Sequence, residues 1–133
     1  MDNPKNIYQA AGENDVQALE GILAAQPDLA RTPEAASGWS ALHYAAEQNA
    51  SRAAEFLLAH GADANAESEV GETPLHVVAG IEVARVLLGH GADPGRKDQL
   101  GVTPVERANQ GSSREIADLL RDAVGDVCSG NSG

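Results

Sequence analysis

The chain has 133 residues, of which 42% are hydrophobic but only 3% aromatic, and its formal net charge is −11. This length and hydrophobic content allow one folded domain, whose core must consist mainly of Ala, Leu, Val and Ile. Because an acidic surface repels phosphate backbones, the charge argues against nucleic-acid binding and favours basic or polar partners.

Cysteine usage and hydropathy bear on the compartment. The only cysteine is Cys128, so no disulfide can form within the chain, which fits a reducing compartment. Residues 1–5 lack the apolar segment of a signal peptide, and no apolar run is long enough to cross a bilayer. We therefore expect a cytoplasmic protein that does not bind membranes.

The first expected unit is a pair of helices. A short helix is predicted at 7–12, and Asn14 or Asp15 can cap a second helix, whose apolar residues recur at helical spacing. Pro27 should end that helix, and a linking loop is expected at 28–37. The unit lacks a Gly-x-Thr-Pro turn at its start, as expected for a terminal repeat with one polar outer face.

The second unit begins with Gly38-Trp39-Ser40-Ala41-Leu42-His43. Ser40 is a good N-cap for a helix expected from Ala41 to about Gln48. A second helix follows, with an apolar stripe that ends in Leu57-Leu58, and Gly61 should stop it.

The third unit repeats this pattern with a deletion. Gly71-Glu72-Thr73-Pro74-Leu75-His76 again predicts a turn followed by a capped helix. Between His76 and the pair Leu87-Leu88, however, the unit is three residues shorter than its predecessor, and the missing residues fall around Ala79-Gly80. We expect its first helix to be barely more than one turn and the weakest point of the domain.

The fourth unit begins with Thr103-Pro104-Val105-Glu106, a capping box in which Glu106 reaches back to the Thr103 N–H. An apolar stripe ending near Ala123 predicts its second helix, and the charges on the other faces suit a C-terminal cap. The Gly/Ser-rich residues 126–133 are predicted to be a disordered tail.

The turn glycines Gly38, Gly71 and Gly101 recur at intervals of about 33 and 30 residues, which indicates a stacked repeat. Thr-Pro-Leu-His followed by a helix pair and Gly-Ala-Asp resembles the ankyrin repeat. The resemblance implies an all-α solenoid of about four helix-turn-helix units with hairpin-like loops between them, and four units suffice for a monomer. The expected domain, residues 1–125, comprises a capping unit at about 6–30 and repeats at about 38–70, 71–100 and 101–125.

The four histidines have structural explanations. His43 and His76 close the repeated strings, where a ring can bond across the helix start and the neighbouring turn; His60 and His90 lie at helix C-termini, which favour positive charge. Equivalent residues of neighbouring repeats should lie about 8–10 Å apart, too far to share one zinc ion. We predict no metal and no cofactor. No nucleophile-elbow or P-loop motif is present, so we predict no catalysis.

The resemblance implies a protein–protein interaction module that uses hairpin tips and the exposed face of each first helix. The matching residues are Ser37, Trp39, Glu69, Val70, Glu72, Gln99, Leu100 and Val102 on hairpins, and Glu47, Gln48, Asn109 and Gln110 on helices. Apolar residues at turns, and Trp above all, suit a binding surface, and the carboxylates of Glu47, Glu69 and Glu72 would border it. We expect a partner with a basic or mixed polar/apolar segment.

Three alternatives remain open from the sequence. The Trp39 ring either contacts a partner or folds onto the helix of its own or the next repeat, and Val70 and Leu100 are either contacts or partly buried loop anchors. Instead of a scaffold or adaptor, the chain could be a regulatory or inhibitory subunit that masks another protein. An enzyme of unknown type is the third possibility.

Overall fold

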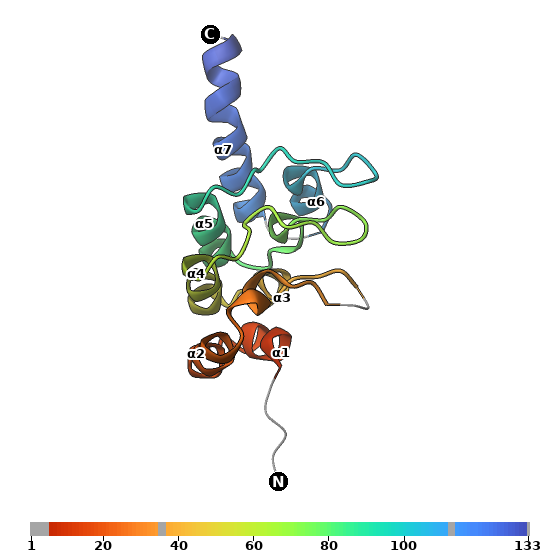
Figure 1. Cartoon of the computed structure of the whole chain (residues 1–133). Coiled ribbons are helices and arrows are strands. Elements are labelled where there is room, and N and C mark those ends of the chain that lie inside the picture. The colour runs from red at the N-terminus through yellow and green to blue at the C-terminus, as the bar shows by residue number, and fades with distance from the viewer. Residues whose placement is uncertain (1–5, 35–36, 112–113, 133) are drawn as a thin grey trace.

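The helices of the computed structural model form two parallel columns (Figure 1). The structure describes residues 6–34, 37–111 and 114–132, and these residues form helices, turns and loops but no strand. The elements in order are α1 (Ile7–Gly12), α2 (Val16–Ala25), the 3₁₀ helix η1 (Pro27–Arg31), α3 (Ala41–Glu47), α4 (Ser51–Ala59), the 3₁₀ helix η2 (Pro74–Val77), α5 (Ile81–Gly89), α6 (Pro104–Gly111) and α7 (Arg114–Ser132). The predicted all-α solenoid is confirmed.

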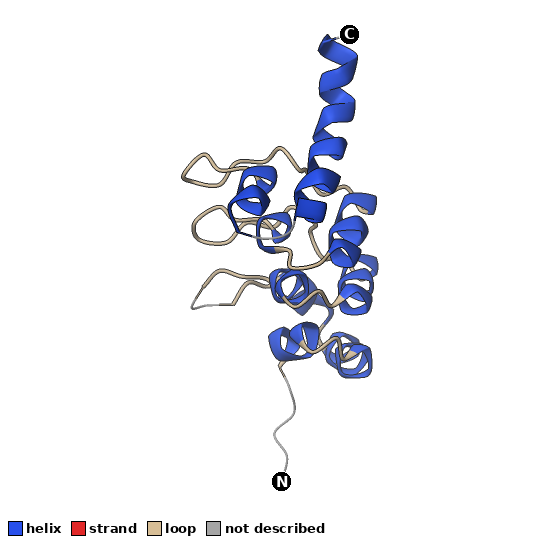
Figure 2. Ribbon diagram, turned by 180° about the vertical axis from the view of Figure 1, so that it is seen from behind, coloured by secondary structure: helices blue, strands red, loops and turns tan. Residues whose placement is uncertain are grey.

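Contacts between elements define the two layers. The first layer contains α1, α3, η2 and α6, each packed on the next, and the second contains α2, α4, α5 and α7 in the same order. Three long loops project beside the first layer, which is most evident from behind (Figure 2). We call the side of the molecule that the first helices and these loops form the concave face.

The core lies between the layers. Each second helix places one fully buried leucine there: Leu19, Leu57, Leu87 and Leu120. Many of the other core residues are alanines, whose small side chains let neighbouring helices approach closely. Truncating one of these leucines to alanine costs about 2–5 kcal/mol in a typical core.

Two asparagines connect successive units. Asn14 and Asn49 adopt the left-handed conformation, with φ of 60° and 54°. The Oδ1 of Asn14 accepts a hydrogen bond from the N–H of Ala53 in the next unit (2.8 Å), and the Oδ1 of Asn49 accepts from the N–H of Val83 (3.3 Å). Each asparagine side chain thus caps a backbone N–H in the first turn of the second helix of the next unit.

The short third unit has the expected form. Its first helix, η2, contains only four residues. Beyond it, the Ala79 N–H donates to the Ala46 carbonyl of α3 (3.1 Å), so a contact between units replaces a helical hydrogen bond. Gly80 lies so close to Asn49 that an added Cβ would be 2.0 Å from the asparagine Cγ.

Two predictions from the sequence differ from the structure. The segment expected to be a linking loop, 28–37, begins within η1, and residues 35–36 lie outside the described part. The tail predicted to be disordered at 126–133 instead continues α7 through Ser132, while Gly133 is not described. No proline follows Arg114, so nothing blocks the i to i−4 hydrogen bonding once the helix has formed.

Within the described residues, no helix combines the length and the apolar character needed to span a bilayer.

Replacing Gly80 by alanine should destabilise the protein by about 1–3 kcal/mol, because the new methyl group collides with the side chain of Asn49. The matched control is Gly21→Ala in α2, where an added Cβ meets nothing within 4 Å and helix propensity predicts a gain of up to about 1 kcal/mol. Urea unfolding measures both changes. Equal stabilities of G80A and G21A would contradict the close approach.

Backbone amides from Val77 to Ile81 should exchange with solvent faster than amides inside α3 and α6. Their segment has a single short 3₁₀ turn in place of a full helix, so local opening breaks fewer hydrogen bonds. Hydrogen–deuterium exchange followed by NMR measures the rates, and slower exchange at 77–81 would show that the shortened unit is not the weak point.

Candidate partner-binding face

The hairpin tips of the third and fourth units are held by one polar side chain each. The Oγ of Ser68 accepts hydrogen bonds from the N–H groups of Val70 and Glu72, both at 3.2 Å. The Oδ1 of Asp98 accepts from the N–H groups two and four residues ahead, both at 2.9 Å. The bond from the Val102 N–H is the main cause that lowers the pKa of Asp98, so the carboxylate stays charged in its buried position.

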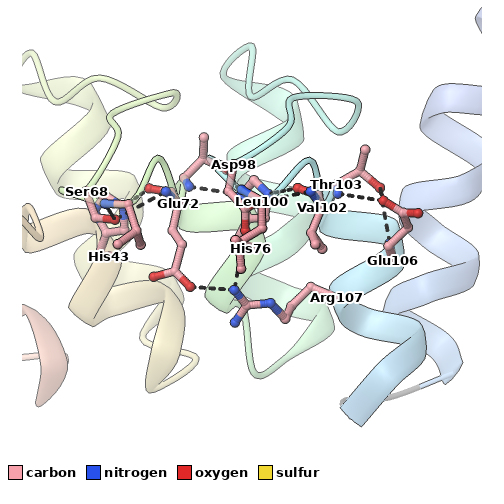
Figure 3. A network of polar contacts seen from close by, with 12 residues as sticks. His43, Ser68, Glu72, His76, Asp98, Leu100, Val102, Thr103, Glu106 and Arg107 are labelled. Atoms are coloured by element: carbon pink, nitrogen blue, oxygen red, sulfur yellow. Dashed lines mark hydrogen bonds and ion pairs between the residues drawn. The ribbon is translucent and has the colours of Figure 1, made fainter.

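A histidine ties each of two helix starts to the next hairpin (Figure 3). The Ser40 N–H donates to Nδ1 of His43 (3.1 Å), so the ring proton lies on Nε2, which donates to the Glu72 carbonyl (2.7 Å). His76 repeats this arrangement between the Thr73 N–H (3.0 Å) and the Val102 carbonyl (2.7 Å). The expected bonding of these rings across the helix start and the neighbouring turn is confirmed.

In the fourth unit a glutamate replaces the histidine. The Thr103 N–H donates to Oε1 of Glu106 (2.9 Å), and the Glu106 N–H donates to the Thr103 Oγ1 (3.2 Å). The predicted capping box is therefore present.

The other two histidines each have a local hydrogen-bond partner. Nδ1 of His60 lies 2.8 Å from the Phe56 carbonyl oxygen, and Nδ1 of His90 lies 2.9 Å from the Val86 carbonyl oxygen. Both rings are exposed at the ends of α4 and α5. In the part of the chain that the structure describes, no three His, Cys, Asp or Glu side chains are grouped as a metal site would require.

Four of the predicted contact residues meet on two adjacent tips. The Gln99 N–H donates to the Val70 carbonyl (3.0 Å), and its side-chain amide donates to the Glu69 carbonyl (2.9 Å). Leu100 beside them is 87% exposed and Val70 is 51% exposed. Leu100 is therefore not a partly buried loop anchor, whereas Val70 keeps about half of its surface covered and its carbonyl accepts the Gln99 bond. The tips are instead an exposed apolar pair in a polar setting.

Trp39 packs on the helix of its own unit. Its ring stacks on His43 at a centroid distance of 5.5 Å and meets Tyr44 edge-on at 5.0 Å. Ser37 supports this hairpin, because its Oγ accepts from the Trp39 N–H (3.1 Å) and donates to Glu34 (2.9 Å). The Trp39 side chain is half-buried, so packing does not remove it from the surface.

Trp39 also lines an open groove of about 460 Å³ on the concave side, which we call the η2 groove. It is lined by Trp39, Glu47, Glu72, His76, Val77, Val78, Arg107 and Gln110. The groove brings together four of the predicted contact residues, which come from the second, third and fourth units: Trp39, Glu47, Glu72 and Gln110. Val77, Val78 and Arg107 were missed by the sequence analysis, although the shortened third unit was a signal that the surface changes at this place.

The predicted acidic border needs one correction. Glu72 does not present a free carboxylate, because its Oε2 lies 2.5 Å from Nη2 of Arg107, and its side chain is only 15% exposed. Arg107 also lies 3.6 Å from Asp98, whose side chain is 3% exposed. Glu47 and Glu69 are exposed, as expected. The exposed negative border thus consists of these two residues, and the Glu72 carboxylate is paired with Arg107.

Two other predicted residues, Gln48 and Val102, lie outside the groove. Gln48 is exposed at the end of α3, with its stem beside Gly12 of α1. Val102 is half-buried, and its carbonyl accepts the His76 bond. Both residues contact the neighbouring unit of the stack, and neither shares a surface with the groove.

Stacked helix pairs with projecting hairpins define a helical repeat protein. A match to the family described as ankyrin repeats, in three copies, spans residues 7–98. The chain therefore belongs to the ankyrin repeat family.

A second comparison covers less of the molecule. The chain is 35% identical over 74 residues to a rice protein (Oryza sativa subsp. japonica) named probable E3 ubiquitin-protein ligase XBOS31. The aligned part is 56% of this chain but only 17% of that protein. The similarity therefore concerns a small part of the rice protein.

Stability should fall as the pH drops below about 6.5, because burial lowers the pKa of His43 and its ordinary value is 6.5. Below this pH the His43 imidazole is protonated more readily in the unfolded chain than in the folded chain. The free energy of unfolding is therefore highest above pH 6.5 and falls on acidification. Between pH 7.5 and 5.5, the free energy of unfolding should fall by about 1 kcal/mol less in the His43→Gln variant than in the wild type. Urea unfolding at both pH values measures it. Parallel losses in the wild type and H43Q would exclude His43 as the cause.

Proposed function

We propose that the chain is a protein–protein interaction module that binds a partner along its concave face and performs no catalysis. The observation that supports this most directly is the exposed apolar pair Val70 and Leu100 on adjacent hairpin tips. Burying a leucine at an interface contributes favourable free energy, whereas a solvent-exposed loop gains nothing from it. Membership of the ankyrin repeat family, whose repeats bind proteins, agrees with this function.

The face combines two kinds of contact. The tips offer the apolar side chains of Val70 and Leu100, whose backbone N–H groups donate to Ser68 and Asp98, so the tip backbone loses little conformational entropy when a partner packs on it. The exposed carboxylates of Glu47 and Glu69, and a net charge of −11, favour a partner with a basic or mixed polar/apolar segment. We propose that the chain acts as a monomer in the cytoplasm. Its single cysteine cannot form a disulfide within the chain, which fits a reducing compartment.

Leu100→Ser should weaken partner binding by about 5- to 30-fold without changing the fold, because this side chain is 87% exposed in the free protein. Partners captured from native cell extract by the wild-type chain would be identified by mass spectrometry and then titrated as purified proteins. The matched control is Ala59→Ser, at an exposed apolar position on α4 in the second layer. Equal affinity of L100S and A59S for every partner would overturn the assignment of this face.

A further inference from the structure

The η2 groove exists because one helix turn is missing from the first layer. α3 ends at Glu47 and α6 extends past Gln110, whereas η2 between them ends at Val77. The last turns of α3 and α6 therefore form two walls, and Val77 and Val78 form the floor. Trp39 borders the groove from the hairpin side. The shortening produces a recess where an uninterrupted stack would present a continuous helical face.

The charges around this recess are unequal. Glu72 and Asp98 share the guanidinium group of Arg107, so Arg107 is already balanced. Glu47 at the rim is exposed, and it forms no ion pair with another residue in the described part of the chain. Three carboxylates therefore face one cation, and the local charge is negative.

A recess that has an apolar floor and a carboxylate at its rim fits one class of side chain. Lysine and arginine lay an aliphatic stem along apolar surface and keep the charged head at the edge. A cation near Trp39 could also interact with the face of its ring. A wholly apolar occupant would instead desolvate the Glu47 carboxylate without giving it a partner, and an acidic occupant would be repelled.

We propose that the η2 groove binds one lysine or arginine side chain from an extended segment of the partner protein. The stem lies along Val77 and Trp39, and the charged head pairs with Glu47. This inference rests on the proposed function of the concave face and adds the chemistry of the residue that the face selects.

The test uses a phage-displayed library of random seven-residue peptides, selected on the immobilised 133-residue chain. Enriched peptides are labelled and titrated by fluorescence polarisation against the wild type, Glu47→Gln and the control Glu55→Gln, which removes an equal charge from exposed α4. We expect a Lys or Arg at a constant position. Glu47→Gln should weaken binding about fivefold, and Glu55→Gln should leave it unchanged.

Two further peptides isolate the pair. Replacing the constant basic residue by norleucine should lower wild-type affinity about fivefold and should have little effect on binding to E47Q. The variant Glu47→Lys should prefer a peptide in which that residue is glutamate. Thermal unfolding of each variant confirms that the fold is intact.

The outcomes separate this inference from the proposed function. Peptides without a constant Lys or Arg, no peptide binding, or equal binding to E47Q and E55Q would overturn the inference. If the partner captured from cell extract still depends on Leu100 but not on Glu47, the concave face remains the binding face and only the basic side chain is excluded. A partner that depends on neither overturns both.

Discussion

The hydrogen bond from a buried imidazole to the carbonyl of the next hairpin is the interaction on which the concave face depends. Nε2 of His43 and of His76 reaches that carbonyl at 2.7 Å, while Nδ1 of the same ring accepts an N–H at its own helix start. One rigid ring therefore sets the distance between a helix and the following loop. Because both nitrogens are buried, a displaced hairpin would leave a polar atom unsatisfied at a cost of about 1–3 kcal/mol.

The shortened third unit shows how this scaffold tolerates a local loss. The hairpin and helix start of η2 keep the same bonds as in the second unit, so the missing turn is removed only from the end of the helix. After η2, the chain packs against the end of α3: the Ala79 N–H donates to the Ala46 carbonyl, and Gly80 lies against Asn49. The loss is confined to the concave surface, where it opens a recess without disturbing the core.

Features set by neighbouring residues could be predicted from the sequence. The capping box of Thr103 and Glu106 and the length of η2 depend on local chemistry and on counting residues. The pairing of Glu72 with Arg107 could not be predicted, because these residues are 35 positions apart and meet only after two units stack. The packing of Trp39 was left open for the same reason: a hairpin residue can turn toward either of two helices.

The two left-handed asparagines give the stack a direction. Asn14 and Asn49 each bond an amide of the unit that follows, and the two buried histidines also point forward along the chain. A unit therefore receives its capping acceptor from its predecessor, which leaves the ribosome first. This direction suits folding during synthesis, because each new helix pair can pack on a preceding unit that has already folded.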